Sequence, residues 1–139
     1  MGGMSVVRVL LVDDFEPFRK FACGVLKGRP ELQVICEASD GEEAVLKARE
    51  LQPDLILMDI GLPKLNGIEA ARRILRSSPQ SKILFVSQES SVEVVQAALD
   101  TGACGYLAKA DAGSELLGAV DSVLRSCRFV SARLGPILI

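Results

Sequence analysis

The sequence contains no histidine and no tryptophan, and its aromatic residues are five phenylalanines and a single tyrosine. Without histidine, Ser-His and Cys-His nucleophiles, imidazole acid–base catalysis and all His-ligated metal sites are excluded. Chemistry in this chain must therefore come from carboxylates, hydroxyls and lysines.

An excess of positive charge is also lacking, because 16 Lys and Arg stand against 18 Asp and Glu. No basic field attracts a phosphate backbone, so we expect no nucleic-acid binding by these residues alone. The apolar stretch in Met1–Val12 is interrupted by Arg8 and ended by Asp13 and Asp14. It fits neither a signal sequence nor a membrane span, and we expect no membrane partner.

The cysteines are few and scattered, with no C-x-x-C pair that would indicate zinc binding or a redox motif. We expect Cys23, Cys36, Cys104 and Cys127 to be free thiols in a cytoplasmic protein. With 139 residues, of which 49% are hydrophobic, the chain can bury a core without disulfides or a structural metal. One soluble globular domain is predicted.

Short apolar runs alternate with amphipathic helical patterns along the chain. The runs predicted as buried strands are Val6–Val12, Leu32–Cys36, Leu55–Met58, Lys82–Val86 and Gly105–Ala108. Helix starts are indicated by three pairs in which a capping residue precedes a glutamate by three positions: Asp40 with Glu43, Asn66 with Glu69, and Ser90 with Glu93. This (βα)5 alternation predicts an α/β fold, a doubly wound five-stranded parallel sheet with the flavodoxin-like order 2-1-3-4-5.

Polar residues terminate four of the predicted strands. Asp13 and Asp14 end the first, Asp59 the third, Ser87 the fourth and Lys109 the fifth. Carboxyl ends of parallel strands share one edge, and ligands bind there at the point where strand order reverses. The predicted order brings the three aspartates together at that point.

Carboxylates so close repel one another by about 4 kcal/mol per pair at ~4 Å and an effective dielectric of ~20, so positive charge must lie among them. Lys109 supplies one charge, and an oxygen-only cluster suits Mg²⁺ or Mn²⁺. Metal, lysine and carboxylates together favour phosphoryl transfer to a carboxylate. Asp59 is the expected nucleophile because it stands alone before the tight loop Ile60–Pro63.

Three segments resemble bacterial response-regulator receiver domains, which are CheY-like. They are Leu10–Asp14, Leu57–Gly67 and Gly105–Lys109, and they occur in the family's order together with Ser87. The resemblance covers residues 6–126, which leaves 1–5 as an N-terminal extension and 127–139 as a C-terminal tail.

The resemblance implies a receiver domain of two-component signal transduction. Asp59 would be phosphorylated by a partner histidine kinase. Asp14 would bind Mg²⁺ directly, Asp13 through water, and Gly61 through its carbonyl oxygen. The domain would accept a phosphoryl group and would not act as an enzyme.

The resemblance also assigns roles in switching. Ser87 would hydrogen-bond the phosphoryl group, Lys109 would form an ion pair with it, and Tyr106 would occupy the aromatic switch position. The switch would bias a surface for protein interaction, including a phosphorylation-dependent homodimer.

Two departures from the broad family pattern are informative. Ala110 stands where many receivers have proline, and the stretch Lys109–Leu117 resembles LuxR/NarL-type regulators, which continue into a DNA-binding domain. The chain is either the receiver part of such a transcription regulator, with DNA bound through a missing domain, or a stand-alone receiver. Gln88 follows Ser87 where a small residue is common, which would alter access to the phosphoryl group.

Several alternatives share the predicted fold. An FMN module would need a phosphate-cradling loop where Asp13–Glu16 places carboxylates, and no G-x-G-x-x-G follows any strand as in a nicotinamide-binding domain. A Mg²⁺-dependent aspartyl-phosphate phosphatase remains the enzyme alternative. A pseudo-receiver that binds partners without phosphorylation remains the interaction alternative.

Overall fold

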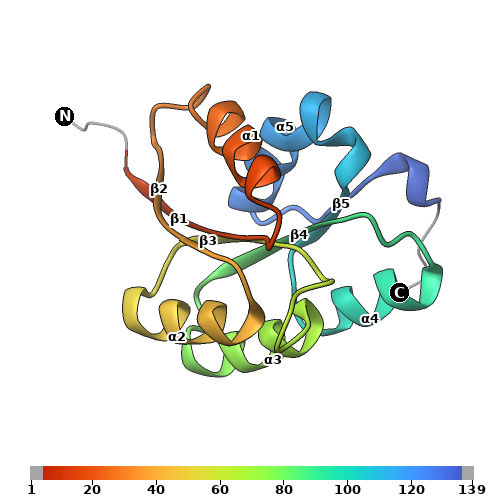
Figure 1. Ribbon diagram of the computed structural model, residues 1–139. Helices are drawn as coiled ribbons and strands as arrows, with labels where there is room; N and C mark the ends of the chain where they lie inside the picture. The colour runs from red at the N-terminus through yellow and green to blue at the C-terminus, as the bar shows by residue number, and fades with distance from the viewer. Residues whose placement is uncertain (1–4, 136–139) are drawn as a thin grey trace.

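The computed structural model describes residues 5–135, which form one parallel sheet with helices on both faces (Figure 1). The strands are β1 (Val7–Val12), β2 (Leu32–Ala38), β3 (Leu55–Met58), β4 (Lys82–Ser87), β5 (Gly105–Ala108) and β6 (Phe129–Val130). The helices are α1 (Glu16–Leu26), α2 (Gly41–Leu51), α3 (Gly67–Ser77), α4 (Val92–Asp100) and α5 (Ala112–Leu124). Two 3₁₀ turns, η1 (Lys109–Asp111) and η2 (Ala132–Leu134), complete the elements.

The sheet runs β2-β1-β3-β4-β5-β6, with every neighbouring pair parallel. The predicted count of five strands is wrong, because β6 extends the sheet beyond β5. Its two residues are too short a run to give a strand signal of their own, and they lie in the segment predicted as a tail. The first five strands stand in the predicted order.

Side chains on successive strand residues alternate between two apolar layers, as the twofold period of a strand requires. Leu10, Ile56 and Phe85 point to the layer under α2, α3 and α4, whereas Leu11 and Leu57 point to the layer under α1 and α5. Figure 1 shows these helix groups on opposite faces. Both faces are thus covered, which explains why the strands are apolar almost without interruption. Within residues 5–135, no helix is long and apolar enough to cross a membrane.

Side-chain caps begin three of the helices. The Asp40 carboxylate accepts a hydrogen bond from the Glu43 amide, and the Asn66 side chain accepts one from the Glu69 amide, both as predicted. The third cap is Ser91, whose hydroxyl accepts from Val94 N, and not the predicted Ser90. The helix there begins one residue later than predicted, since Ser90 and Ser91 are both favourable capping residues and the sequence does not distinguish them.

The β6 strand depends on a glycine opposite it. Gly105 of β5 pairs with Phe129, and a Cβ atom built on Gly105 would lie 2.7 Å from the Phe129 carbonyl oxygen. Only a residue without a side chain allows this approach. Residues 136–139, the end of the predicted C-terminal tail, lie outside the described residues.

Candidate functional site

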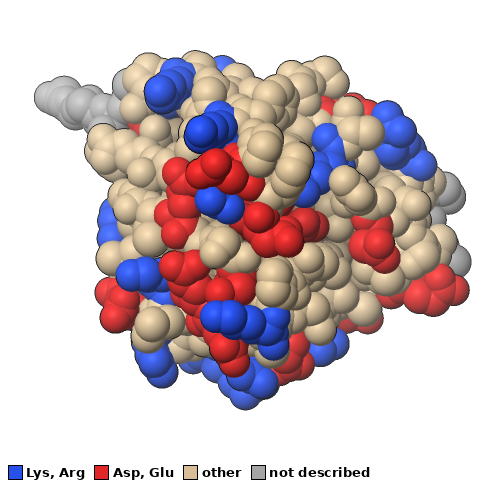
Figure 2. All heavy atoms as spheres, in the orientation of Figure 1, with Lys and Arg blue, Asp and Glu red and all other residues tan. Residues whose placement is uncertain are grey.

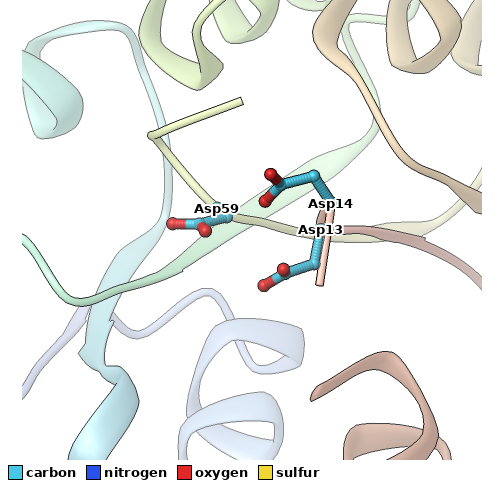
Figure 3. Close-up of side chains that lie close together, drawn as sticks. All are labelled: Asp13, Asp14 and Asp59. Atoms are coloured by element: carbon cyan, nitrogen blue, oxygen red, sulfur yellow. The ribbon is translucent and has the colours of Figure 1, made fainter. Parts of the chain in front are cut away.

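The aspartates at the strand ends are held by extensions of the sheet itself. Asp13 N donates to Ala38 O of β2 at 3.1 Å, and Asp59 N donates to Val12 O of β1 at 3.0 Å. Each backbone is therefore positioned by its neighbouring strand, although each residue lies just beyond its own. One oxygen from each of Asp13, Asp14 and Asp59 lies within 4.8 Å of the others. Figure 3 shows their side chains converging from the ends of β1 and β3.

Lys109 follows β5 and reaches this cluster with its amine. Lys109 Nζ lies 2.7 Å from Asp13 Oδ2 and 3.2 Å from Asp59 Oδ2, so one cation bridges two carboxylates. It also lies 4.6 Å from the centre of the Phe18 ring, within range of a cation–π contact. The predicted meeting of these residues at one edge of the sheet is thus observed.

The remaining carboxylate oxygens of the bridged pair accept backbone hydrogen bonds. Phe15 N donates to Asp13 Oδ1 at 2.8 Å, and Ile60 N donates to Asp59 Oδ1 at 2.7 Å. Asp14 differs, because its side chain is exposed and no cation among the described residues lies within 4.0 Å of it. The cluster therefore keeps an open, negatively charged side.

Burial and ion pairing shift the protonation of two of these groups. Burial raises the pKa of Asp13, which is 1% exposed, although hydrogen bonds from Lys109 and Phe15 oppose that shift. For Lys109, burial would lower the pKa, but the carboxylates of Asp13 and Asp59 outweigh it and raise the pKa above its ordinary value. The lysine is thus held in its charged form.

Ser87 and Tyr106 meet around the backbone of Glu89. Ser87 Oγ accepts from Glu89 N at 3.1 Å, and Tyr106 donates its hydroxyl to Glu89 O at 2.8 Å. The Tyr106 ring is fully buried and packs near Phe85 with centroids 6.2 Å apart. Burial first, and then the charges of Glu89 and Asp59, raise the pKa of Tyr106 to about 12, against a lowering effect of Ser87.

A cleft of about 380 Å³ opens over the cluster. Its lining residues are Asp14, Phe15, Asp59, Gly61, Ser87, Gln88, Glu89 and Lys109. Figure 2 shows acidic side chains gathered near the middle of this face, with basic ones among them. Nearly all residues predicted for the site line this cleft, and the two others, Asp13 and Tyr106, are buried next to it.

Three further residues, which the sequence did not indicate as part of the site, support or line it. Arg19 of α1 donates to the Asp13 carbonyl oxygen at 2.6 Å and to Glu37 at 2.9 Å, and thereby ties the loop after β1 to β2. Phe15 lines the cleft and is 60% exposed, and Glu89 supplies the carbonyl for Tyr106. Phe15 and Glu89 follow strand ends closely, which is a usable signal, whereas nothing in the local sequence marks Arg19.

The fold and the site together define a class: doubly wound α/β domains with a lysine-bridged aspartate cluster at the switch point of the sheet. Comparison with known proteins agrees, since the family model described as response regulator receiver domain matches residues 9–121. The chain belongs to the response-regulator receiver family.

Two of the similar proteins are named as a response regulator and as a transcriptional regulatory protein. The chain is 37% identical over 134 residues to response regulator GacA of Pseudomonas protegens, covering 96% of this chain and 63% of that protein. It is 35% identical over 128 residues to the transcriptional regulatory protein DegU of Brevibacillus brevis, covering 92% of this chain and 54% of that protein. Thus the chain spans less than two thirds of the length of these relatives.

A solved structure shares both fold and sequence. It is a LuxR-family two-component response regulator from Aurantimonas sp. SI85-9A1, with a TM-score of 0.88 and 33% identity, covering 94% of this chain and 93% of that one. The chain is therefore a receiver domain related to LuxR-type regulators.

Proposed function

We propose that this receiver accepts a phosphoryl group on Asp59 from a phosphohistidine of a partner histidine kinase, in a reaction that requires Mg²⁺ or Mn²⁺. The observation that carries the proposal is the bridging of Asp13 and Asp59 by Lys109 beside the exposed carboxylate of Asp14. Such a cluster offers an acceptor carboxylate, a fixed cation and an unneutralised side within a single cleft.

The donor set suits a hard divalent cation. Three carboxylates and one lysine leave the cluster with two excess negative charges when all are ionised. Oxygen ligands of this kind match Mg²⁺, which binds through one or two carboxylates and retains waters. Asp13, Asp14 and Asp59 would hold the ion, with the Gly61 carbonyl as a further ligand on the cleft wall. When bound, the ion neutralises charge on the transferring phosphoryl group.

The transfer itself forms one bond and breaks one. An oxygen of Asp59 attacks phosphorus, the bond from phosphorus to the donor's imidazole nitrogen breaks, and that nitrogen retains the electron pair and takes a proton from water. Lys109 orients the Asp59 carboxylate before the transfer. After it, the lysine amine can form an ion pair with the negatively charged phosphoryl oxygens. Each chain would accept one phosphoryl group, so the domain acts as a stoichiometric acceptor and not as an enzyme.

Ser87 and Tyr106 are the proposed switch. The Ser87 hydroxyl would give up its hydrogen bond from Glu89 N and turn to the phosphoryl group. This would remove one hydrogen bond that holds the loop in which the Glu89 carbonyl oxygen accepts from Tyr106. A change in that loop would bias the surface of α4, β5 and α5 toward another set of contacts, including a homodimer.

The related transcription regulators suggest the setting of this domain. We propose that it is the regulatory part of a LuxR/NarL-type regulator, with DNA bound by a domain that this sequence does not contain. The similarity to GacA and DegU supports this, because both are response or transcriptional regulators by name.

Intact mass after incubation with a small acyl phosphate and Mg²⁺ tests the proposal. We expect a single phosphoryl adduct that is absent with a chelator and absent in Asp59→Asn. Asp54→Asn is the matched control, because Asp54 precedes the same strand at the opposite edge of the sheet, where it accepts from Arg8 N. This variant should take up the phosphoryl group like the wild type.

Other outcomes point to the alternatives. Folded protein that binds Mg²⁺ but gains no phosphoryl group would contradict phosphorylation and favour a pseudo-receiver. Continuous release of product from a chromogenic phosphoester would contradict the stoichiometric role and favour a phosphatase.

A further inference from the structure

The segment Phe129–Leu134, here called the strap, folds back onto the sheet beside the site. It comprises β6 and η2 and pairs with the free edge of β5. Leu134 is buried in the same apolar cluster as Tyr106. The strap therefore contacts the strand that leads directly into Lys109.

Ser131 joins the strap to the residue before Lys109. Its hydroxyl accepts a hydrogen bond from Ala108 N at 2.8 Å, and its own amide donates to Tyr106 O at 3.0 Å. Ser131 is 1% exposed, so water does not replace its hydroxyl. A buried amide without an acceptor is costly, and Ser131 is the acceptor that satisfies Ala108.

Arg133 joins the strap to the second residue after Lys109. Its Nε and Nη2 atoms lie 2.7 Å and 2.6 Å from the two carboxylate oxygens of Asp111. This paired geometry fixes both distance and orientation, which a single point charge does not. Arg133 also lines a cleft with Ser87 and Lys109, so the ion pair lies close to the reacting groups.

The backbone of Lys109 lies between these two attachments, in a turn with little rigidity of its own. The η1 turn has three residues, and 3₁₀ hydrogen bonds have poorer geometry than those of an α-helix. The Lys109 side chain must nevertheless hold its amine against two carboxylates. The attachments at Ala108, directly before Lys109, and at Asp111, two residues after it, restrict this turn from both sides.

We propose that Ser131 and Arg133 are positioning residues for Lys109, through which the strap controls phosphoryl transfer to Asp59. The effect on transfer rests on the proposed function, whereas the effect on the turn does not. Coupling between two sites is reciprocal. A phosphoryl group on Asp59 that draws Lys109 toward it would therefore also change the contacts that Ser131 and Arg133 make with Ala108 and Asp111. The chain that follows the strap would thereby sense the state of the site.

The test uses Ser131→Ala, Arg133→Ala and Arg133→Lys in the full chain. Arg29→Ala is the matched control, because Arg29 forms a similar arginine–aspartate pair with Asp121, at 2.8 Å and 3.4 Å, that involves neither η1 nor the strap. Two quantities are measured: amide hydrogen exchange across residues 108–111 without phosphodonor, and the rate of phosphorylation by an acyl phosphate with Mg²⁺. Unfolding is measured alongside to correct for stability.

We expect exchange at residues 108–111 to rise by about tenfold in Ser131→Ala, which loses one buried hydrogen bond. A similar factor is expected in Arg133→Ala, which loses two hydrogen bonds whose net worth is reduced because the Arg133 side chain is 54% exposed. Exchange should stay unchanged in Arg29→Ala. The phosphorylation rate at saturating donor should fall by about tenfold, since small misplacements of a charged group cost that much or more. Arg133→Lys should recover part of the rate, because it retains charge but loses the paired geometry.

Equal exchange and equal rates in Arg133→Ala and Arg29→Ala, at matched stability, would overturn the proposal and leave a structural ion pair. If the wild type gains no phosphoryl group, the proposed function fails. The exchange measurement then decides the positioning role by itself: faster exchange in the strap variants supports it, and unchanged exchange overturns it.

Discussion

Lys109 is the residue on which the electrostatics of the site depend. It lies between two carboxylates with its side chain only 12% exposed, so its charge is screened weakly by solvent. Breaking such a pair leaves a buried, uncompensated carboxylate, which costs far more than losing an exposed ion pair.

We therefore expect Lys109→Met to lower the unfolding free energy by about 3 kcal/mol at neutral pH without Mg²⁺. Burial raises the pKa of Asp13, so folding favours its protonated form. The stability that the folded state gains from a protonated Asp13 is present below the pKa of Asp13 in the unfolded chain. It is lost as pH rises through the higher pKa of Asp13 in the folded protein. Denaturant unfolding should thus show the Lys109→Met penalty shrinking as pH falls toward 4. Lys47→Met, which breaks an exposed pair with Glu50 at 3.8 Å, should change stability by less than about 0.5 kcal/mol.

Tyr106 offers a direct optical measurement, because it is the only tyrosine and the chain has no tryptophan. Its pKa is raised to about 12, chiefly by burial, so phenolate absorbance should appear only near that pH in folded protein. Folding favours the neutral phenol, and this stability is lost as pH rises from the unfolded pKa of 10.0 through about 12. Tyr106→Phe should lack that alkaline loss, and a midpoint near 10 in folded wild type would contradict the buried position.

At the scale of elements, loops after the strands depend on close backbone approaches. Gly67 begins α3, and a Cβ atom built on it would lie 2.1 Å from the Asp59 carbonyl oxygen. Its amide donates to Ile60 O at 2.7 Å. The start of α3 is thereby packed directly against the loop that carries Asp59.

Gly67→Ala should lower stability by about 1–3 kcal/mol and slow phosphorylation, because the Asp59 loop must move to admit the methyl group. Gly24→Ala is the contrasting variant. Gly24 lies within α1 with nothing near the added methyl group, so we expect stabilisation by about 0.5–1 kcal/mol and no effect on phosphorylation. Thermal unfolding and the acyl phosphate reaction measure both effects, and equal responses of the two variants would refute this packing argument.

At the scale of the whole molecule, the cluster couples cation binding to folding. An ion that binds only the folded state adds stability that grows with its concentration, about 2.7 kcal/mol at a hundredfold excess over Kd. Mg²⁺ should raise the melting temperature of the wild type by several degrees at constant ionic strength. Asp14→Asn should lose most of this shift, because Asp14 is the exposed carboxylate without a cation partner among the described residues. Asp100→Asn, which alters an exposed residue at the end of α4, is the control. Its melting temperature should rise with Mg²⁺ as much as that of the wild type.

The order of elements and most of the site could be predicted from the sequence alone. Buried parallel strands require apolar runs, and polar residues at their carboxyl ends must meet at one edge of the sheet. For that reason the sequence predicts that Asp13, Asp14, Asp59, Ser87 and Lys109 lie at one edge of the sheet, and the structure places them there. Local rules predicted the caps at Asp40 and Asn66, whereas two adjacent serines left the start of α4 ambiguous by one residue.

Only the tertiary structure decided how those residues are supported. β6 is too short to have a periodicity, and it exists because Gly105 admits Phe129 to the edge of β5. The hydrogen bond from Ala108 to Ser131 joins residues 23 positions apart, and the pair between Asp111 and Arg133 joins residues 22 apart. A local pattern reports which face of an element is buried, but the partner of a side chain is set by packing between elements, which no local spacing encodes.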